Sequence, residues 1–149
     1  MAVDFSEFEK FKEKLKGIEK ELPAFFEGCA NEIGARLLRA TKQKTPVGIY
    51  PSESGKTGGT LRRNWNVTEV KHTLGGYTLN VINNTEYASY VEYGHRQNVG
   101  QFVPALGKKL KKPWVEGRHM LTDSVNELKP KVDGITEKRL NTWLEEKLK

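Results

Sequence analysis

Residues 83–96, NNTEYASYVEYGHR, decide how the chain is read, because they combine a helix start, an aromatic face and a helix stop. We predict that Asn83 or Asn84 caps the amino end of a short helix, with Glu86 placed to return the hydrogen bond. Gly94 is predicted to close the carboxyl end in the left-handed conformation. A helix this short is not stable alone, so the segments before and after it must hold it.

The predicted helix has two neighbouring rows of side chains. Tyr87, Ala88 and Val91 fall at the spacing of one helical face, which we expect to pack inward. Tyr90 and Tyr93 form the adjacent ridge. These tyrosines therefore serve either the core or a contact surface.

The amino-terminal part, from about residue 4 to residue 44, is predicted to be helical. Helix starts are available at Asp4 or Ser6, and Pro23 predicts either two helices or one kinked rod near Leu22. Apolar residues recur there at steps of three and four: Phe5, Phe8, Phe11, Leu15, Ile18, Leu22, Phe25, Cys29, Ile33 and Leu37.

Residues 45–60, TPVGIYPSESGKTGGT, predict a long loop, because prolines and glycines interrupt any regular element. The triplet GKT at 55–57 resembles part of a phosphate-binding loop, but Tyr50 stands where that motif needs a glycine, and a helix precedes the loop where the motif needs a strand. We expect this loop to be an arm that orders on assembly.

Residues 61–74 and 77–83 predict two strands joined by a tight turn at Gly75 and Gly76. Alternation sends Arg62 and Arg63 to opposite faces of the first strand. The apolar pattern changes phase along that strand, so either a bulge lies near 68–69 or the sheet is apolar on both faces at that end, and we favour the bulge. The expected cross-strand pairs are Leu74 with Tyr77, His72 with Leu79, and Val70 with Val81.

The remainder predicts a basic, mobile loop over 95–112, a short strand at Trp114 and Val115, and a long terminal helix from Met120 with a kink or break near Lys129. The fold class is α+β, with helices on one side of a small antiparallel sheet. We expect one domain, residues 1–149, with long loops at about 45–60 and 95–113. A chain of 149 residues is long enough to bury a core of its own.

Composition narrows the function. The single cysteine, Cys29, lies in an apolar helical stripe and is expected to be a small buried side chain. No apolar run is long enough to cross a membrane, so we expect no membrane association. The net charge of +6 is concentrated in 36–71, which carries eight Lys or Arg against two Glu. Such a patch attracts phosphate backbones or acidic protein surfaces.

Catalytic and metal-binding patterns are not apparent. The ionisable candidates are scattered over a hairpin, a helix end and loops, so we expect no enzyme, no cofactor and no metal. Two alternatives stay open. A small basic nucleic-acid-binding module would use Arg62, Arg63 and Trp65. A small hydrolase would depend on His95.

Three segments together resemble the head-tail joining or tail-completion proteins of tailed bacteriophages and prophages. They are TPVGIY with TGGTLRRNW (45–50 and 57–65), NNTEYASYVEYGHR (83–96) and WVEGRHML (114–121), in the same order as in the family pattern. One departure is the insertion of 49–56 between the Pro-Val and Thr-Gly parts of the first segment.

The resemblance implies a non-enzymatic structural subunit of the virion neck or upper tail, made in the bacterial host cytoplasm. It implies a ring of identical copies, six-fold or a multiple, between connector proteins and tail-tube or tail-terminator proteins, with channel DNA as a further contact. Candidate interface residues are Thr45, Pro46, Val47, Thr57, Gly58, Leu61, Arg62, Arg63, Trp65, Tyr87, Tyr90, Glu92, Tyr93, His95, Arg96, Lys108, Lys109, Lys111 and Lys112.

Overall fold

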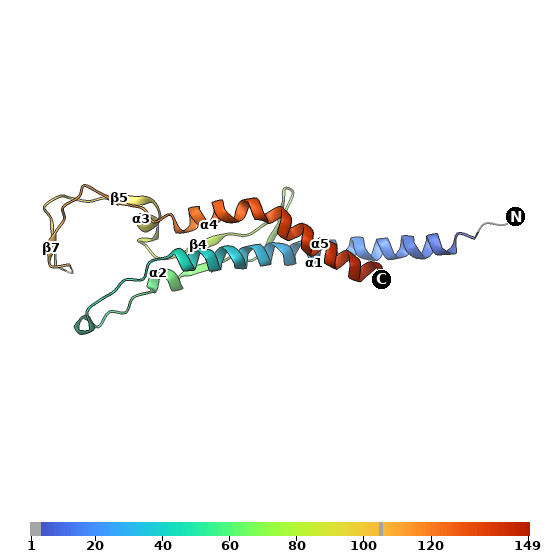
Figure 1. Ribbon diagram of the computed structural model, residues 1–149, viewed down its shortest axis with the longest axis horizontal. Coiled ribbons are helices and arrows are strands. Elements are labelled where there is room, and N and C mark those ends of the chain that lie inside the picture. The colour runs from blue at the N-terminus through green and yellow to red at the C-terminus, as the bar shows by residue number, and fades with distance from the viewer. Residues whose placement is uncertain (1–3, 105) are drawn as a thin grey trace.

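The computed structural model describes residues 4–104 and 106–149, and it is an elongated α+β molecule (Figure 1). A long helix, α1 (Ser6–Lys44), runs along most of its length. Two helices from the end of the chain, α4 (Met120–Leu128) and α5 (Val132–Leu148), lie alongside α1 and run in the opposite direction. The strands within residues 94–116 lie at the end where α1 finishes, whereas the hairpin of residues 71–78 lies beside the middle of α1. The predicted fold class is confirmed.

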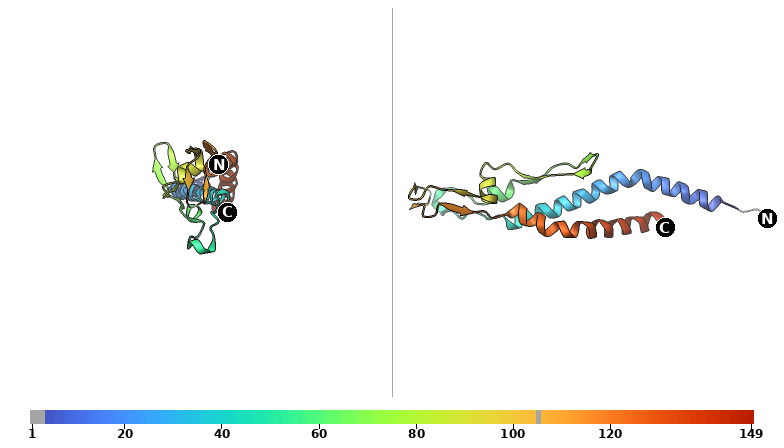
Figure 2. Two further views of the ribbon diagram at one scale, coloured as in Figure 1. Left: turned by 90° about the vertical axis from the view of Figure 1, so that its left-hand side faces the viewer. Right: turned by 90° about the horizontal axis from the view of Figure 1, so that it is seen from above.

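The first helix is continuous through Pro23. Figure 2 shows that it bends along its length, so of the two alternatives the single kinked rod is correct. The helix begins at Ser6, whose backbone N–H donates to the Asp4 carboxylate at 2.8 Å. That hydrogen bond lowers the pKa of Asp4. Cys29 is buried, as predicted, and burial raises the pKa of its thiol.

The strands form four separate two-stranded antiparallel ladders. The pairs are β1 (Trp65–Val67) with β4 (Val81–Asn83), β2 (Lys71–Thr73) with β3 (Gly76–Thr78), β5 (Gly94–Arg96) with β8 (Trp114–Glu116), and β6 (Phe102–Val103) with β7 (Lys108–Lys109). Within the described residues each ladder therefore keeps its outer edges free of a further strand.

The hairpin from β1 to β4 differs in register from the prediction. His72 pairs with Tyr77, their rings stacked at 4.4 Å, and Thr73 pairs with Gly76, so the turn lies at 74–75. Tyr77 pairs with His72 where Leu74 was predicted, a difference of two residues, and Val81 pairs with Val67 where Val70 was predicted, a difference of three. The bulge is confirmed, because 68–70 on one side lie opposite 79–80 on the other.

Residues Thr60–Arg63 form a one-turn helix, α2, where the sequence predicted the start of a strand. The backbone N–H groups of Arg63 and Asn64 donate to the carbonyls of Gly59 and Thr60. The prediction was wrong because four residues are too few for alternation to separate a strand from a helical turn. Arg62 and Arg63 consequently do not lie on opposite faces of a strand.

The short helix predicted from 83–96 is present as α3 (Ala88–Tyr93), but its caps differ. It begins beyond Asn83, whose side-chain oxygen accepts from Thr85 N–H instead of capping the helix. Gly94 has φ +85° and ψ 173°. Its φ is positive, as predicted for a glycine cap, but its ψ is extended, so it does not adopt the left-handed helical conformation. Ala88 is buried and Val91 half-buried, whereas Tyr87 is 45% exposed.

The predicted break near Lys129 is confirmed. A 3₁₀ turn, η2 (Lys129–Lys131), carries Pro130 and separates α4 from α5. The second of these helices returns along α1, where Trp143 stacks on Phe25 at 4.8 Å. Two ion pairs fix the contact, Arg139 with Glu32 and Lys147 with Glu21, each at 2.6 Å.

One small core holds the strand-bearing end together. Leu61, Trp65, Ala88 and Met120 are buried and come from four different segments. Half-buried side chains pack around them from α1, β4, α3 and α4: Leu38, Val81, Val91 and Leu121. Because these segments are distant in sequence, the core joins the three motif segments into one structural unit.

Candidate assembly surface

Two projections extend beyond this core at one end of the molecule, opposite the amino terminus (Figure 1). The first arm is residues 46–59, with a 3₁₀ turn, η1 (Ser52–Ser54), near its tip. The second arm is residues 94–117, which contain β5 to β8. The end-on view in Figure 2 shows how narrow the molecule is across its long axis.

Thr45 anchors the first arm. Its hydroxyl donates to the Thr41 carbonyl at 2.7 Å and accepts from the Trp65 indole N–H at 2.8 Å. Its carbonyl accepts from Arg62 Nε at 3.2 Å and Nη2 at 2.7 Å. Thr45 is 1% and Trp65 4% exposed, so the hydrogen bond between them is shielded from water. The arm therefore leaves the end of α1 in a fixed direction.

The two sides of the first arm cross closely near its base. A Cβ at Gly58 would collide with the Gly48 carbonyl, so only glycine fits there. Arg63 Nη1 donates to the Gly58 carbonyl at 3.1 Å and holds the returning side. Farther out the arm is open: Ile49 is 97% exposed, and Lys56 Nζ lies 5.9 Å from the Tyr50 ring.

Glu92 anchors the second arm and is 5% exposed. Its carboxylate accepts from the backbone N–H of Leu121 at 3.0 Å and of Thr122 at 2.9 Å, and from the Thr122 hydroxyl at 2.7 Å. The two amides belong to the first turn of α4, where N–H groups have no partner within the helix. A carboxylate there also interacts favourably with the helix dipole. One side chain of α3 thus caps α4.

The two sides of the second arm meet the helices through paired glycines. A Cβ at Gly94 would meet the Val115 carbonyl, and a Cβ at Gly117 would meet the Glu92 carbonyl. His119 adopts φ 48° and ψ 40° just before α4, held by its N–H donating to the Glu92 carbonyl at 3.0 Å. The close backbone contact leaves no room for side chains at either glycine.

Beyond this base the second arm continues as a narrow hairpin. Gly100 N–H donates to the Leu110 carbonyl at 2.7 Å, and Leu110 N–H donates to the Gln101 carbonyl at 2.8 Å. The predicted loop over 95–112 contains short paired strands, at Gly94–Arg96, Phe102–Val103 and Lys108–Lys109, and its mobility stays a prediction. Its exposed residues include Val99, Phe102, Leu106, Lys108, Lys109, Lys111 and Lys112.

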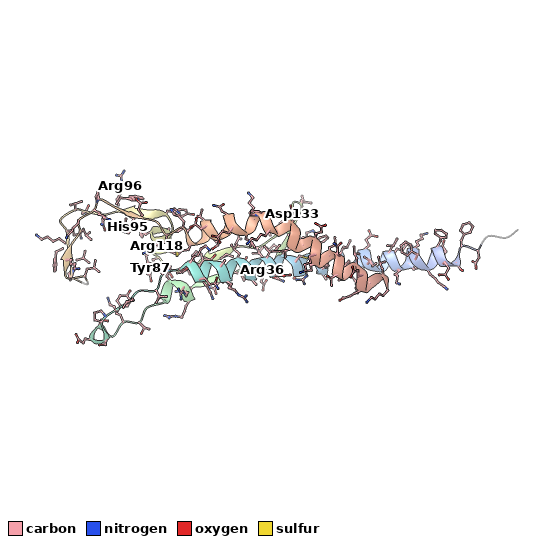
Figure 3. The ribbon with its side chains drawn as sticks, in the orientation of Figure 1. Arg36, Tyr87, His95, Arg96, Arg118 and Asp133 are labelled. Carbon is pink, nitrogen blue, oxygen red and sulfur yellow. The ribbon has the colours of Figure 1, made fainter. Side chains whose placement is uncertain are left out.

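Aromatic and cationic side chains flank the start of the second arm. Tyr90 is 58% and Tyr93 65% exposed. Arg96 points away from the ribbon (Figure 3), and the His95 ring lies 5.7 Å from the Tyr90 ring. Buried His95 Nδ1 has no hydrogen-bond partner among the described residues. These groups form an accessible polar and aromatic surface beside α3.

Burial divides the predicted interface residues into two groups. The first is buried in the base of the arms and positions them: Thr45, Leu61, Trp65 and Glu92. The second is exposed or half-buried and accessible to another molecule: Pro46, Val47, Thr57, Gly58, Arg62, Arg63, Tyr87, Tyr90, Tyr93, His95, Arg96, Lys108, Lys109, Lys111 and Lys112. The contact role of the second group stays a prediction.

Sequence reasoning missed two residues that position the arms. Asn83 Nδ2 donates to the Leu61 carbonyl at 2.8 Å, which ties β4 to α2. The NxT spacing from Asn83 to Thr85 favours the local side-chain turn that is observed, and was the available signal. Met120 is fully buried at the start of α4. No local signal separates it from the other apolar residues of its helix.

The arrangement defines a class of protein. Among residues 4–104 and 106–149, no group of three or more acidic, histidine or cysteine side chains is placed to hold a metal ion. None of the helices in this part of the chain is both long and apolar enough to span a membrane. What the fold builds is a helical rod with two anchored arms at one end.

A family model described as "Bacteriophage HK97-gp10, putative tail-component" matches residues 9–94. The match covers more than half of the chain, and the protein belongs to this family of phage tail components. The predicted family resemblance is thereby confirmed. The match starts within α1, before the first of the three motif segments, and ends at Gly94, before the third. No curated protein and no solved structure matches the chain.

Proposed function

We propose that this tail component is a non-enzymatic subunit of the phage neck or upper tail. Copies form a ring at the head-tail interface, and the two arms contact the adjacent connector, tail-tube or tail-terminator protein. The observation that carries the proposal is the common base of the arms. Residues from three motif segments converge there to fix two exposed projections at the same end of one molecule.

The charge of the arms suits an acidic partner surface. The second arm exposes four lysines, and among the described residues none of these forms an ion pair with the chain itself. Lysines without internal partners remain available to an opposite charge on a neighbour. DNA passing through a channel is a second acidic surface that the same lysines would attract.

The backbone of the arms also suits protein contacts. The β6 and β7 ladder has two strands, so its outer N–H and C=O groups are available for strand addition by a neighbour. Exposed Phe102 and Leu106 lie beside those edges. Backbone pairing supplies binding energy, while side-chain pockets on the neighbour supply specificity.

The proposal is tested with Tyr90→Ala combined with Tyr93→Ala, two exposed side chains on α3. We expect the purified double variant to keep the wild-type melting temperature and to fail in an assembly assay that counts tailed particles. The matched control is Glu137→Ala, an exposed helical position away from the arms. Normal particle numbers with the double variant would remove these tyrosines from the interface.

The four exposed lysines favour one alternative, a nucleic-acid-binding module. It predicts that the isolated protein binds duplex DNA with an affinity that falls steeply with salt, and that replacing the lysines flattens that dependence. The structural proposal expects weak DNA binding outside the assembled particle. A gel-shift titration at two salt concentrations separates the two.

A further inference from the structure

The first half of α1 carries a seam of apolar residues that continues beyond the rest of the molecule. The seam comprises Phe8, Phe11, Leu15, Ile18, Leu22, Phe25 and Cys29. The steps between them alternate between three and four residues throughout. That is the 3.5-residue repeat of a coiled-coil seam, which packs against another helix along its whole length.

The chain covers only the second half of this seam. Ile18, Phe25 and Cys29 are buried, and α5 packs against this part of α1 through Trp143, which stacks on Phe25. α5 ends at Leu148, and the carbonyl of the final residue accepts from Lys14 Nζ at 3.0 Å. Figure 1 shows α1 continuing past that end as an isolated helix.

The uncovered half of the seam is strongly apolar and exposed to solvent. Phe8 is 71%, Phe11 51% and Leu15 45% exposed, and Phe5 beside them is 60% exposed. Large aromatic residues repeated on one exposed face indicate an interaction surface. Because the same repeat is already packed against a helix farther along, the missing cover is expected to be another helix.

We propose that the uncovered seam pairs with the same segment of a second copy, with the two helices parallel and in register. Beside the seam, Glu7 and Lys14 occupy one flanking position of the repeat, and Lys12 and Glu19 occupy the other. All four are exposed. In a parallel pair Glu7 meets Lys12 of the second copy, and Lys14 meets Glu19 of the second copy. Every flanking pair is then attractive.

Other occupants fit the charges less well. An antiparallel pair that covers Phe8, Phe11 and Leu15 would place Lys12 against Lys12 of the second copy. A membrane surface would favour a cationic outer face. Residues 4–21 instead carry six acidic and five basic side chains, so the polar face is of mixed sign.

Parallel pairing deepens the proposed function and rests on it for its biological setting. The two copies of such a pair would lie side by side with their arms at the same end. The contact joins two copies only, so a ring of pairs would need a further contact elsewhere on the subunit. The two claims remain separable, because self-association is measured on the purified full-length protein and arm contacts are measured in particles.

The pairing is tested by the mass of the purified protein in solution across a range of concentrations. For the wild type we expect the mass to rise with concentration from 16.9 kDa toward twice that value. Phe8→Ser with Phe11→Ser should raise the dissociation constant at least about tenfold. The matched control, Glu9→Ser with Lys16→Ser on the outer face of the same turns, should leave it unchanged.

These substitutions leave the folded body intact, because the segment projects beyond α5, and an unchanged melting temperature will verify this. A wild-type protein that stays monomeric at every concentration would overturn the proposal. So would a double variant that associates like the wild type. Phenylalanine-dependent binding to anionic phosphatidylserine vesicles by a protein that does not self-associate would assign the seam to a membrane instead.

Direction is tested by charge reversal and by cross-linking. Lys12→Glu should weaken association, because it places Glu7 against a carboxylate, and adding Glu7→Lys should restore it. In a Cys29→Ser background, Leu15→Cys should form a disulfide-linked dimer under mild oxidation. In a parallel pair in register, residue 15 of one copy lies against residue 15 of the other. Association strengthened by Lys12→Glu, or no dimer from Leu15→Cys, would contradict the parallel arrangement.

Discussion

Glu92 connects the second arm to the helices through three hydrogen bonds from the first turn of α4. Replacing it with glutamine keeps the size of the side chain but removes the charge and one acceptor oxygen. We expect Glu92→Gln to lower the free energy of unfolding by about 2 kcal/mol, the magnitude typical of charged hydrogen bonds to a buried group.

Urea denaturation of the full chain provides the measurement. The control is Glu86→Gln, an exposed carboxylate close by in sequence, which we expect to change stability by less than about 0.5 kcal/mol. Equal effects of the two substitutions would show that Glu92 does not cap α4.

At the scale of residues, the sequence identified several important side chains, but it predicted their roles less well. Tyr87, Glu92 and Trp65 were all selected, but only the structure separates the buried anchors from the exposed surface. The bond between Trp65 and Thr45 joins positions 20 residues apart. No local periodicity encodes such a pair, because it depends on where α1 ends.

At the scale of elements, the contact of α5 with α1 depends on a carboxylate. Arg139 at 2.6 Å and Arg36 at 3.0 Å lower the pKa of Glu32 below its usual 4.5. A carboxylate whose folded pKa is depressed contributes stability above the unfolded pKa and loses it as pH falls through the folded pKa. The contribution is therefore complete at neutral pH and disappears in acid.

We predict that Glu32→Gln lowers the stability at pH 7 by up to about 1 kcal/mol, because the ion pairs are partly exposed. The difference between variant and wild type should shrink as the pH is lowered below the usual 4.5 of a glutamate, through the depressed pKa of Glu32. Urea titrations at several pH values measure it. Glu27→Gln, a nearby exposed position, serves as the control, and a difference that grows in acid would contradict the assignment.

Substitution by alanine is expected to have opposite effects on stability at two glycines. Gly117→Ala places a methyl group against the Glu92 carbonyl, whereas Gly134 in α5 has nothing within 4 Å of the added Cβ. We expect Gly117→Ala to destabilise the protein by more than about 1 kcal/mol and to increase proteolysis of the second arm.

Gly134→Ala should instead raise stability by roughly 0.5–1 kcal/mol, because alanine favours the helix. Thermal melts of both variants provide the comparison. If both alanines destabilise equally, the close approach at Gly117 does not control the arm.

Long elements were predictable and short ones were not. The repeated apolar spacing of α1 and the proline at Pro130 determined the helices and the break between them. The one-turn helix α2 and the hairpin register were predicted wrongly, because a few residues of alternation are outweighed by tertiary contacts such as the burial of Leu61. Of the short strands in the second arm, only the one at Trp114 and Val115 was predicted.

At the scale of the molecule, function follows from an elongated shape with two different ends. One end carries two arms on a shared base, and the other carries an uncovered helical seam (Figure 1). Many exposed large apolar residues lie on the arms and on that seam, and few lie on the faces where α1, α4 and α5 meet. This distribution is typical of a subunit that completes its packing in an assembly.

Electron cryomicroscopy of assembled phage particles tests this account most directly, by locating the subunit along the tail axis. The account predicts a ring of copies at the neck or upper tail, with residues 46–59 and 94–117 in contact with the adjacent protein layer. Particles that lack the subunit, or rings in which both arms face solvent, would contradict it.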